Sequence, residues 1–290
     1  MKYFGDTLLM ETVSPDGEDG FPGTLKIAVR YTLTDDNTFR MDYRVSSDAD
    51  TIVNLTNHSY FNLDGGGDVL NQKLRIYASR YLEGNNATCP TGNILPVANT
   101  PMDFTAGKTI GKEIDTGFSQ TTMVGGGYDH CYVIDRARGS SQSICAWATS
   151  DKTGISMKLY TTQPGIQLYT GNFLQDCPAP GKGGEPMRKY GGFAWRPSTI
   201  PAAPLTRSSP LRCCGQARCS APPPPCGSSP ASSAESFKND TPCKNVCFGR
   251  RFLHGGRLRL REFPSPFLCF AQTAHSIHVK SAKNLCQSKV

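Results

Sequence analysis

The sequence predicts an all-β chain, and three observations support this prediction. Apolar and polar residues alternate with a strict two-residue period in several stretches, which is the pattern of strands that bury one face. Turn-forming residues separate these stretches. No stretch shows a convincing 3.6-residue amphipathic period, which would indicate a helix.

The first predicted element is an antiparallel hairpin over residues 25–33 and 39–45. Its apolar side chains occupy every second position: Leu25, Ile27, Val29, Tyr31 and Leu33, then Phe39, Met41, Tyr43 and Val45. Asp35, Asp36 and Asn37 supply the turn between them. The hairpin is therefore expected to bury one face.

Shorter apolar runs predict the remaining strands. They lie at residues 51–53, 132–134, 144–148, 155–159 and 162–173. In the last of these, Ile166 and Leu168 share one face, so the side chain of Gln167 points to the opposite face, with Tyr169 beside it. Gln167 is therefore free to face a cleft.

A polar motif follows residues 51–53. Residues 54–63 read NLTNHSYFNL and place one histidine, His58, among amides, hydroxyls and aromatic rings. Such side chains orient a sugar, although a lone histidine in a strand is more often a half-buried packing residue than a catalyst. Both interpretations of His58 stay open on these residues alone.

A second motif, GGYDH at residues 126–130, contains the candidate binding residue Asp129. It is followed directly by the predicted strand at residues 132–134. An aspartate after glycines and before a strand is, on its own, usually a turn former that bonds its own backbone. A role in binding therefore depends on the other motifs.

Three stretches together closely resemble motifs of the aldose 1-epimerases, also called galactose mutarotases: residues 54–63, 126–130 and 162–173. The resemblance covers about residues 3–193 and implies a large antiparallel β-sandwich whose concave face holds a hexose. It implies that His58 is the general acid that protonates the ring oxygen of the sugar, and that Asp129 and Gln167 contact the substrate. No metal and no organic cofactor is called for. The related epimerases of phosphorylated hexoses have substrates that the sequence does not exclude.

The resemblance ends where the family carries its general base. Family members continue from Gly-Phe through two residues to Glu-Thr-Gln, and that glutamate is the base. Here Gly192-Phe193 is followed by Ala194, Trp195 and then Arg196 in the glutamate position. We therefore expect an isomerase by resemblance whose own activity is lost. Mutarotation, hexose binding without catalysis, and a non-functional product of a defective gene model remain as three hypotheses.

Composition changes at the same point and divides the chain into residues 1–195 and 196–290. The first part has a net charge of −4, whereas the second has a net charge of +11, with 12 of the 21 prolines and 8 of the 12 cysteines. Such a segment is expected to be a largely disordered tail. Its basic charge leaves nucleic acid or anionic lipid as alternative partners. It lacks regular interleaving of aromatic and basic residues, so neither partner is expected.

A shifted reading frame accounts for the tail. Suppose that the ancestral run after Phe193 was Cys-Leu-Glu-Thr-Gln-His-Tyr. With suitable codons, deletion of its first nucleotide gives Ala-Trp-Arg-Pro-Ser-Thr, and the next two bases can begin an isoleucine codon. The chain reads AWRPSTI at residues 194–200. We therefore expect that the tail was never selected for this fold.

The first residues and the cysteines bear on compartment and completeness. The family carries an asparagine-arginine pair and a His-Gly-Gly string upstream of any matching residue here, so an incomplete sandwich is expected. Residues 1–20 show no secretory signal, and no stretch approaches the length of a membrane span. Four irregularly spaced cysteines before residue 196 argue against a disulfide scaffold, so a cytoplasmic location is expected. The sequence leaves the oligomeric state open.

Overall fold

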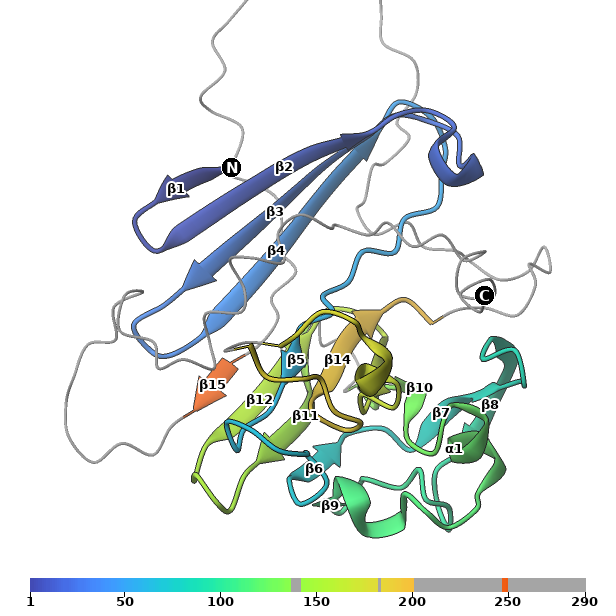
Figure 1. Cartoon of the computed structure of the whole chain (residues 1–290). Helices are drawn as coiled ribbons and strands as arrows, with labels where there is room; N and C mark the ends of the chain where they lie inside the picture. The colour runs from blue at the N-terminus through green and yellow to red at the C-terminus, as the bar shows by residue number, and fades with distance from the viewer. Residues whose placement is uncertain (137–141, 182–183, 201–246, 250–290) are drawn as a thin grey trace, which may run out of the picture.

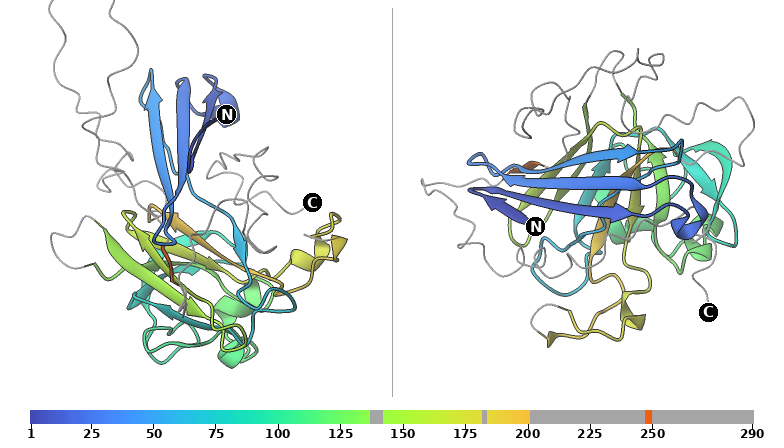
Figure 2. Two further views of the ribbon diagram at one scale, coloured as in Figure 1. Left: turned by 90° about the vertical axis from the view of Figure 1, so that its left-hand side faces the viewer. Right: turned by 90° about the horizontal axis from the view of Figure 1, so that it is seen from above.

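The computed structural model describes residues 1–136, 142–181, 184–200 and 247–249. Within them, the chain forms three antiparallel sheets, which confirms the predicted all-β fold of sandwich type (Figure 1). Two sheets form a compact body, and the third stands away from them (Figure 2).

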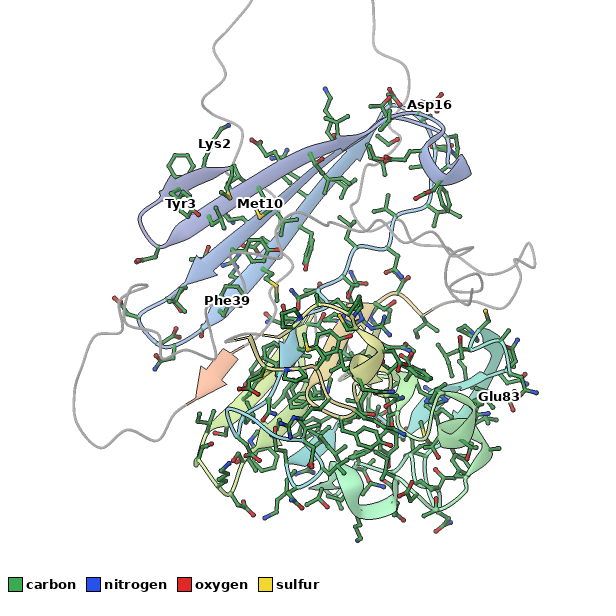
Figure 3. The ribbon with its side chains drawn as sticks, viewed as in Figure 1. Lys2, Tyr3, Met10, Asp16, Phe39 and Glu83 are labelled. Atoms are coloured by element: carbon green, nitrogen blue, oxygen red, sulfur yellow. The ribbon has the colours of Figure 1, made fainter. Side chains whose placement is uncertain are left out.

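The sheet that stands away has four strands in the order β1-β2-β3-β4. They are β1 (Lys2–Phe4), β2 (Thr7–Ser14), β3 (Leu25–Leu33) and β4 (Phe39–Ser47). Leu25 pairs with Ser47 and Leu33 with Phe39, so the predicted hairpin is confirmed. Leu25 and Ile27 are buried in a small cluster of their own. Figure 3 labels Tyr3, Met10 and Phe39 on this sheet, and Glu83 at the far end of the body.

The second sheet has six strands in the order β5-β14-β13-β10-β7-β8. They are β5 (Tyr60–Phe61), β14 (Phe193–Ser198), β13 (Gly165–Tyr169), β10 (Asp129–Val133), β7 (Arg80–Gly84) and β8 (Pro90–Pro96). Strands from distant parts of the sequence thus lie side by side in its centre.

The third sheet has five strands in the order β15-β12-β11-β6-β9. They are β15 (Cys247–Gly249), β12 (Ser156–Thr161), β11 (Ser143–Thr149), β6 (Lys73–Ile76) and β9 (Lys108–Thr109). The strands predicted at residues 144–148 and 155–159 are therefore confirmed as β11 and β12.

The six-stranded and five-stranded sheets share one hydrophobic core. In β12, β13 and β14 every second residue points into it, as the two-residue period requires. Its members include Trp195, Phe193, Tyr132 and Leu168 from the six-stranded sheet, and Met157, Leu159, Leu74 and Ile76 from the five-stranded sheet. This packing fixes which side chains of the six-stranded sheet face outward.

Short helical segments connect the strands. They are η1 (Glu18–Gly20), η2 (Ile110–Glu113), α1 (Ser119–Met123) and η3 (Leu174–Asp176). The sequence analysis found no helix because α1, the only α-helix among the described residues, is too short to show an amphipathic period.

The boundary expected at residue 195 falls inside a strand. β14 continues through Arg196, Pro197 and Ser198 and pairs with β13 over its whole length. The three residues of β15, which also belong to the expected tail, pair with β12. The rest of that tail, residues 201–246 and 250–290, lies outside the described residues.

The cysteines of the first 195 residues differ in state. Cys131 and Cys145 are buried free thiols, and Cys177 is an exposed free thiol. Cys89 is disulfide-bonded. Burial raises the pKa of the Cys131 thiol to about 12, which makes it a poor nucleophile.

The glycine loop before β10 leaves no room for a side chain. A Cβ at Gly127 would lie 2.0 Å from Asn172 Oδ1 and 2.7 Å from Thr170 Oγ1. We therefore expect Gly127→Ala to lower the free energy of unfolding in urea by about 1 to 3 kcal/mol, since overpacking forces neighbours to move. Gly66→Ala is the matched control because nothing lies within 4 Å of that Cβ. Equal losses in both variants would contradict the predicted clash.

Candidate functional site

A row of four side chains crosses the outward face of the six-stranded sheet. Asp129 on β10 is paired with Tyr169 on β13, Tyr169 with Ala194 on β14, and Ala194 with Tyr60 on β5. Directly paired residues of neighbouring strands point to the same side of a sheet. The row therefore places one carboxylate and two phenol rings on one surface.

Two residues next to this row complete a hydrogen-bonded group. Gln167 is paired with Arg196 across β13 and β14, on the same face. Gln167 Nε2 donates to Asp129 Oδ1 at 2.8 Å, and Arg196 Nη2 donates to the same oxygen at 2.7 Å. The side chain of Arg196 is 16% exposed and that of Asp129 is 29% exposed. The ion pair is therefore largely withdrawn from water.

The predicted orientation of Gln167 is confirmed. Ile166 and Leu168 are fully buried on the core side, whereas Gln167 and Tyr169 are only partly buried on the outward side. Asp129 is the first residue of β10, and its side chain bonds Gln167 and Arg196 across the sheet. The sheet thus brings two of the three predicted site residues together.

The third predicted residue, His58, lies in a loop and not in a strand. Residues 50–59 form no strand, and β5 begins only at Tyr60. His58 is exposed, and its ring centroid lies 5.0 Å from that of Tyr60 and 6.1 Å from that of Tyr169. The imidazole therefore stands beside the Asp129 group, separated from it by the two tyrosines of the row.

Hydrogen bonds tie the His58 loop to the chain after Arg196. Thr56 Oγ1 donates to the carbonyl oxygen of Pro197 at 2.8 Å. Asn54 Nδ2 donates to Ser198 Oγ at 3.0 Å, and Asn54 Oδ1 accepts from the backbone N–H of Thr199 at 3.2 Å. The position of His58 thus depends on residues 197–199, which directly follow Arg196.

The histidine that follows Asp129 has the opposite environment. His130 points into the interior, is 3% exposed, and its Nε2 atom has no hydrogen-bond partner. Its ring meets Tyr81 edge to face, with centroids 5.9 Å apart. Burial lowers the pKa of His130 to about 4, and the nearby Asp129 charge opposes this only partly. His130 is therefore neutral at pH 7.

The electrostatics of the outward face follow from the ion pair. Arg196 carries a permanent positive charge and has no acceptor atom, and its carbon Cζ lies 6.0 Å from the ring centroid of Tyr169. Burial raises the pKa of both Tyr60 and Tyr169, so both phenols keep their protons at neutral pH. The face therefore offers hydrogen-bond donors, one engaged carboxylate and aromatic surface.

No group of three or more His, Cys, Asp or Glu side chains among the described residues is placed to hold a metal ion. No helix within the same residues is long and apolar enough to cross a membrane.

Two features of the site escaped the sequence analysis. The pairing of Arg196 with Asp129 depends on strand register, which no single stretch of sequence specifies. The outward position of Tyr60 also depends on register, although this residue stands inside the motif at residues 54–63.

Comparisons with known proteins show the family to which the chain belongs. The family model described as aldose 1-epimerase matches residues 3–213. Aldose 1-epimerase of Escherichia coli K12 is 38% identical over 198 residues, which is 68% of this chain and 56% of that protein. Galactose mutarotase of Rattus norvegicus is 39% identical over 193 residues, which is 66% of this chain and 54% of that protein.

Solved structures agree as well. An aldose epimerase homologue from C. elegans superimposes with a TM-score of 0.59 at 29% identity, over 68% of this chain and 57% of that chain. A galactose 1-epimerase from Lactobacillus acidophilus gives a TM-score of 0.59 at 27% identity, over 68% of this chain and 55% of that chain. The matched segment thus spans little more than half the length of each of these proteins.

Proposed function

Because this chain belongs to the aldose 1-epimerase family, we propose that it carries a hexose-binding site of that family in which ring opening is no longer accelerated. The observation that supports this most directly is the 2.7 Å ion pair between Arg196 and Asp129 on the outward face of the sheet. Arg196 stands where the family has its base, and it also engages a residue that would contact the sugar.

The reaction of an intact site interconverts the α and β anomers of a hexose. A base removes the proton of the anomeric hydroxyl while an acid protonates the ring oxygen. The bond between that oxygen and C1 breaks, the aldehyde rotates, and the ring closes on the other face. In this chain His58 is the group assigned to the acid step, and Asp129 and Gln167 are assigned to the sugar hydroxyls.

The base step has no suitable group at residue 196. A guanidinium stays protonated at all relevant pH values and cannot accept a proton. A general base typically contributes about 10² to 10⁴ in rate. Its loss therefore raises the barrier by roughly 3 to 5 kcal/mol, enough to bring a modest mutarotase close to the spontaneous rate.

Sugar binding is weakened but not removed in this proposal. Asp129 has two carboxylate oxygens, and the bonds from Arg196 and Gln167 both use Oδ1. Oδ2 is left for a sugar hydroxyl, and Gln167 retains its side-chain carbonyl as an acceptor. The protein would then bind hexoses without converting them.

Strand β14 also carries signs of a sequence that was not selected for this position. The buried atoms Trp195 Nε1 and Arg196 Nε both lack a hydrogen-bond partner, and each such atom costs about 1 to 3 kcal/mol. Four further such atoms lie before residue 194 among the described residues, so the proposal that the chain from residue 194 onward is read in a shifted frame rests on the run AWRPSTI at residues 194–200. Sequencing of cDNA around codon 193 tests this, because the original frame should encode Glu-Thr-Gln just after Phe193.

The binding part of the proposal is tested by calorimetric titration with D-galactose. We expect binding by the wild-type chain and a fivefold to tenfold weaker affinity in Asp129→Asn, because a charged acceptor is lost. Asp151→Asn is the matched control, since Asp151 is exposed and paired only with Lys73 on the other sheet. Absence of heat with the wild-type protein, in a sample that melts cooperatively, would favour a product without function.

A further inference from the structure

We propose that Thr170 is a positioning residue for Asp129 and that it acts through the backbone of Tyr128. Thr170 directly follows β13, and its side chain is fully buried. The inference deepens the proposed hexose-binding function, on which its relevance to a sugar rests. The positioning itself concerns contacts within the chain alone, so it can be tested without a sugar.

The hydroxyl of Thr170 completes the hydrogen bonds between β10 and β13 at their open end. Asp129 and Tyr169 form the last pair of the two strands, and just beyond it the N–H of Thr170 donates to the carbonyl oxygen of Tyr128 at 3.1 Å. The N–H of Tyr128 donates to Thr170 Oγ1 at 2.9 Å. Thr170 therefore holds both backbone polar groups of the residue directly before Asp129.

A buried asparagine closes these bonds into a ring. Thr170 Oγ1 donates to Asn172 Oδ1 at 2.6 Å. Asn172 Nδ2 in turn donates to the carbonyl oxygen of Val124 at 2.8 Å and to that of Tyr128 at 3.3 Å. Hydrogen bonds in such a network strengthen one another in a dry interior. The Thr170 hydroxyl acts as acceptor and donor at once, and valine, which lacks the hydroxyl, can do neither.

The loop before Tyr128 needs this support because it consists of glycines, at residues 125–127. The first two have positive φ angles of 86° and 78°. A Cβ at the third would lie 2.7 Å from Thr170 Oγ1, so the loop packs directly on the hydroxyl. Glycines leave a backbone more conformations than other residues do. The loop therefore does not fix the direction of Asp129 by itself.

The direction of Asp129 decides whether its carboxylate reaches its partners. Oδ1 accepts from Gln167 at 2.8 Å and from Arg196 at 2.7 Å. Without the Thr170 hydroxyl, the N–H of Tyr128 would be a buried donor with no acceptor, which is unfavourable. We expect the loop to turn this N–H towards water, and that movement draws Asp129 away from Arg196.

The test is a double-mutant cycle between Asp129 and Arg196 in four backgrounds: wild type, Thr170→Val, Thr170→Ser and Ser150→Ala. The cycle uses Asp129→Asn and Arg196→Gln, and urea denaturation gives their coupling energy in each background. We expect Thr170→Val to reduce the coupling energy to less than half of its wild-type value. Thr170→Ser, which keeps the hydroxyl, should retain it.

Ser150 is the matched control because it is a buried hydroxyl in a similar setting on the other sheet. It directly follows β11, accepts from the N–H of Thr153 at 3.0 Å and donates to the carboxylate of Asp64. Ser150→Ala should therefore lower overall stability as Thr170→Val does, but leave the coupling energy between Asp129 and Arg196 unchanged.

Calorimetric titration with D-galactose extends the test to the sugar. We expect Thr170→Val to bind about threefold to tenfold more weakly than the wild type, since Asp129 is displaced, and Ser150→Ala to bind as the wild type does. An unchanged coupling energy in Thr170→Val would overturn the proposal, and so would an equal fall in Ser150→Ala. If the wild type binds no galactose, the proposed function fails, and the coupling energies alone decide whether Thr170 positions Asp129.

Discussion

Replacing Arg196 by glutamate is expected to lower the free energy of unfolding by about 2 to 4 kcal/mol. The substitution removes the 2.7 Å ion pair with Asp129 and places a second carboxylate beside the first. Loss of the attraction and gain of the repulsion each cost about 1 to 2 kcal/mol at a partly buried position.

Exchanging the two charges distinguishes the electrostatic contribution to the free energy of unfolding from the contribution of side-chain packing. Arg196→Gln removes the charge alone and should cost about 1 to 2 kcal/mol. The double variant Asp129→Arg with Arg196→Asp restores opposite charges, so we expect it to recover more than half of the stability lost in Arg196→Glu. Urea denaturation of the wild type, the single variants Asp129→Arg and Arg196→Asp, and the double variant gives the coupling energy directly. Equal stability of wild type and Arg196→Glu would show that the ion pair contributes nothing.

Acid should destabilise the fold through His130. The unperturbed pKa of histidine is 6.5, and burial lowers it to about 4 in the folded chain. The unfolded state therefore binds a proton more readily, so the stability due to neutral His130 is complete above pH 6.5 and is lost as the pH falls towards 4. The lowered pKa corresponds to about 3 kcal/mol over this interval. His130 Nδ1 accepts a hydrogen bond from the backbone N–H of Asp129 at 3.3 Å. If Nδ1 were protonated, two N–H donors would face each other there.

The variant His130→Leu isolates this contribution. Leucine fills much of the same volume without titrating, and it removes the unpartnered Nε2 atom. Between pH 7 and pH 4.5 the wild-type chain should lose about 2 to 3 kcal/mol more than the variant does, measured by urea denaturation. Parallel pH profiles for the two proteins would contradict the assignment, and another group would then be responsible for any acid sensitivity.

Alternation along single strands predicted much of the fold. The hairpin of β3 and β4 and the outward side of Gln167 both followed from the two-residue period, because that period is a property of consecutive residues. The same rule applied to Asp129 would have put His130 on the buried side. As a motif, the GGYDH string at residues 126–130 does not indicate on which face His130 lies.

Contacts across strands could not be predicted in the same way. Arg196 meets Asp129 because β14 and β10 both pair with β13 in one particular register, and register is fixed by the packed core as a whole. The inclusion of Arg196–Ser198 in β14 is a similar case. A strand can form from an unfavourable sequence when its neighbours offer a complete ladder of hydrogen bonds. Composition does not register such pairing, so it predicted a boundary at residue 195, inside β14.

We propose that this site binds hexoses but no longer accelerates their mutarotation. The direct measurement is polarimetry of freshly dissolved α-D-galactose with the purified chain, with the E. coli relative as a positive control and a buffer blank. We expect the rate with this chain to equal that of the blank, while titration of the same sample shows binding. A rate within tenfold of the E. coli protein would contradict the account, because Arg196 would then not have disabled the base step.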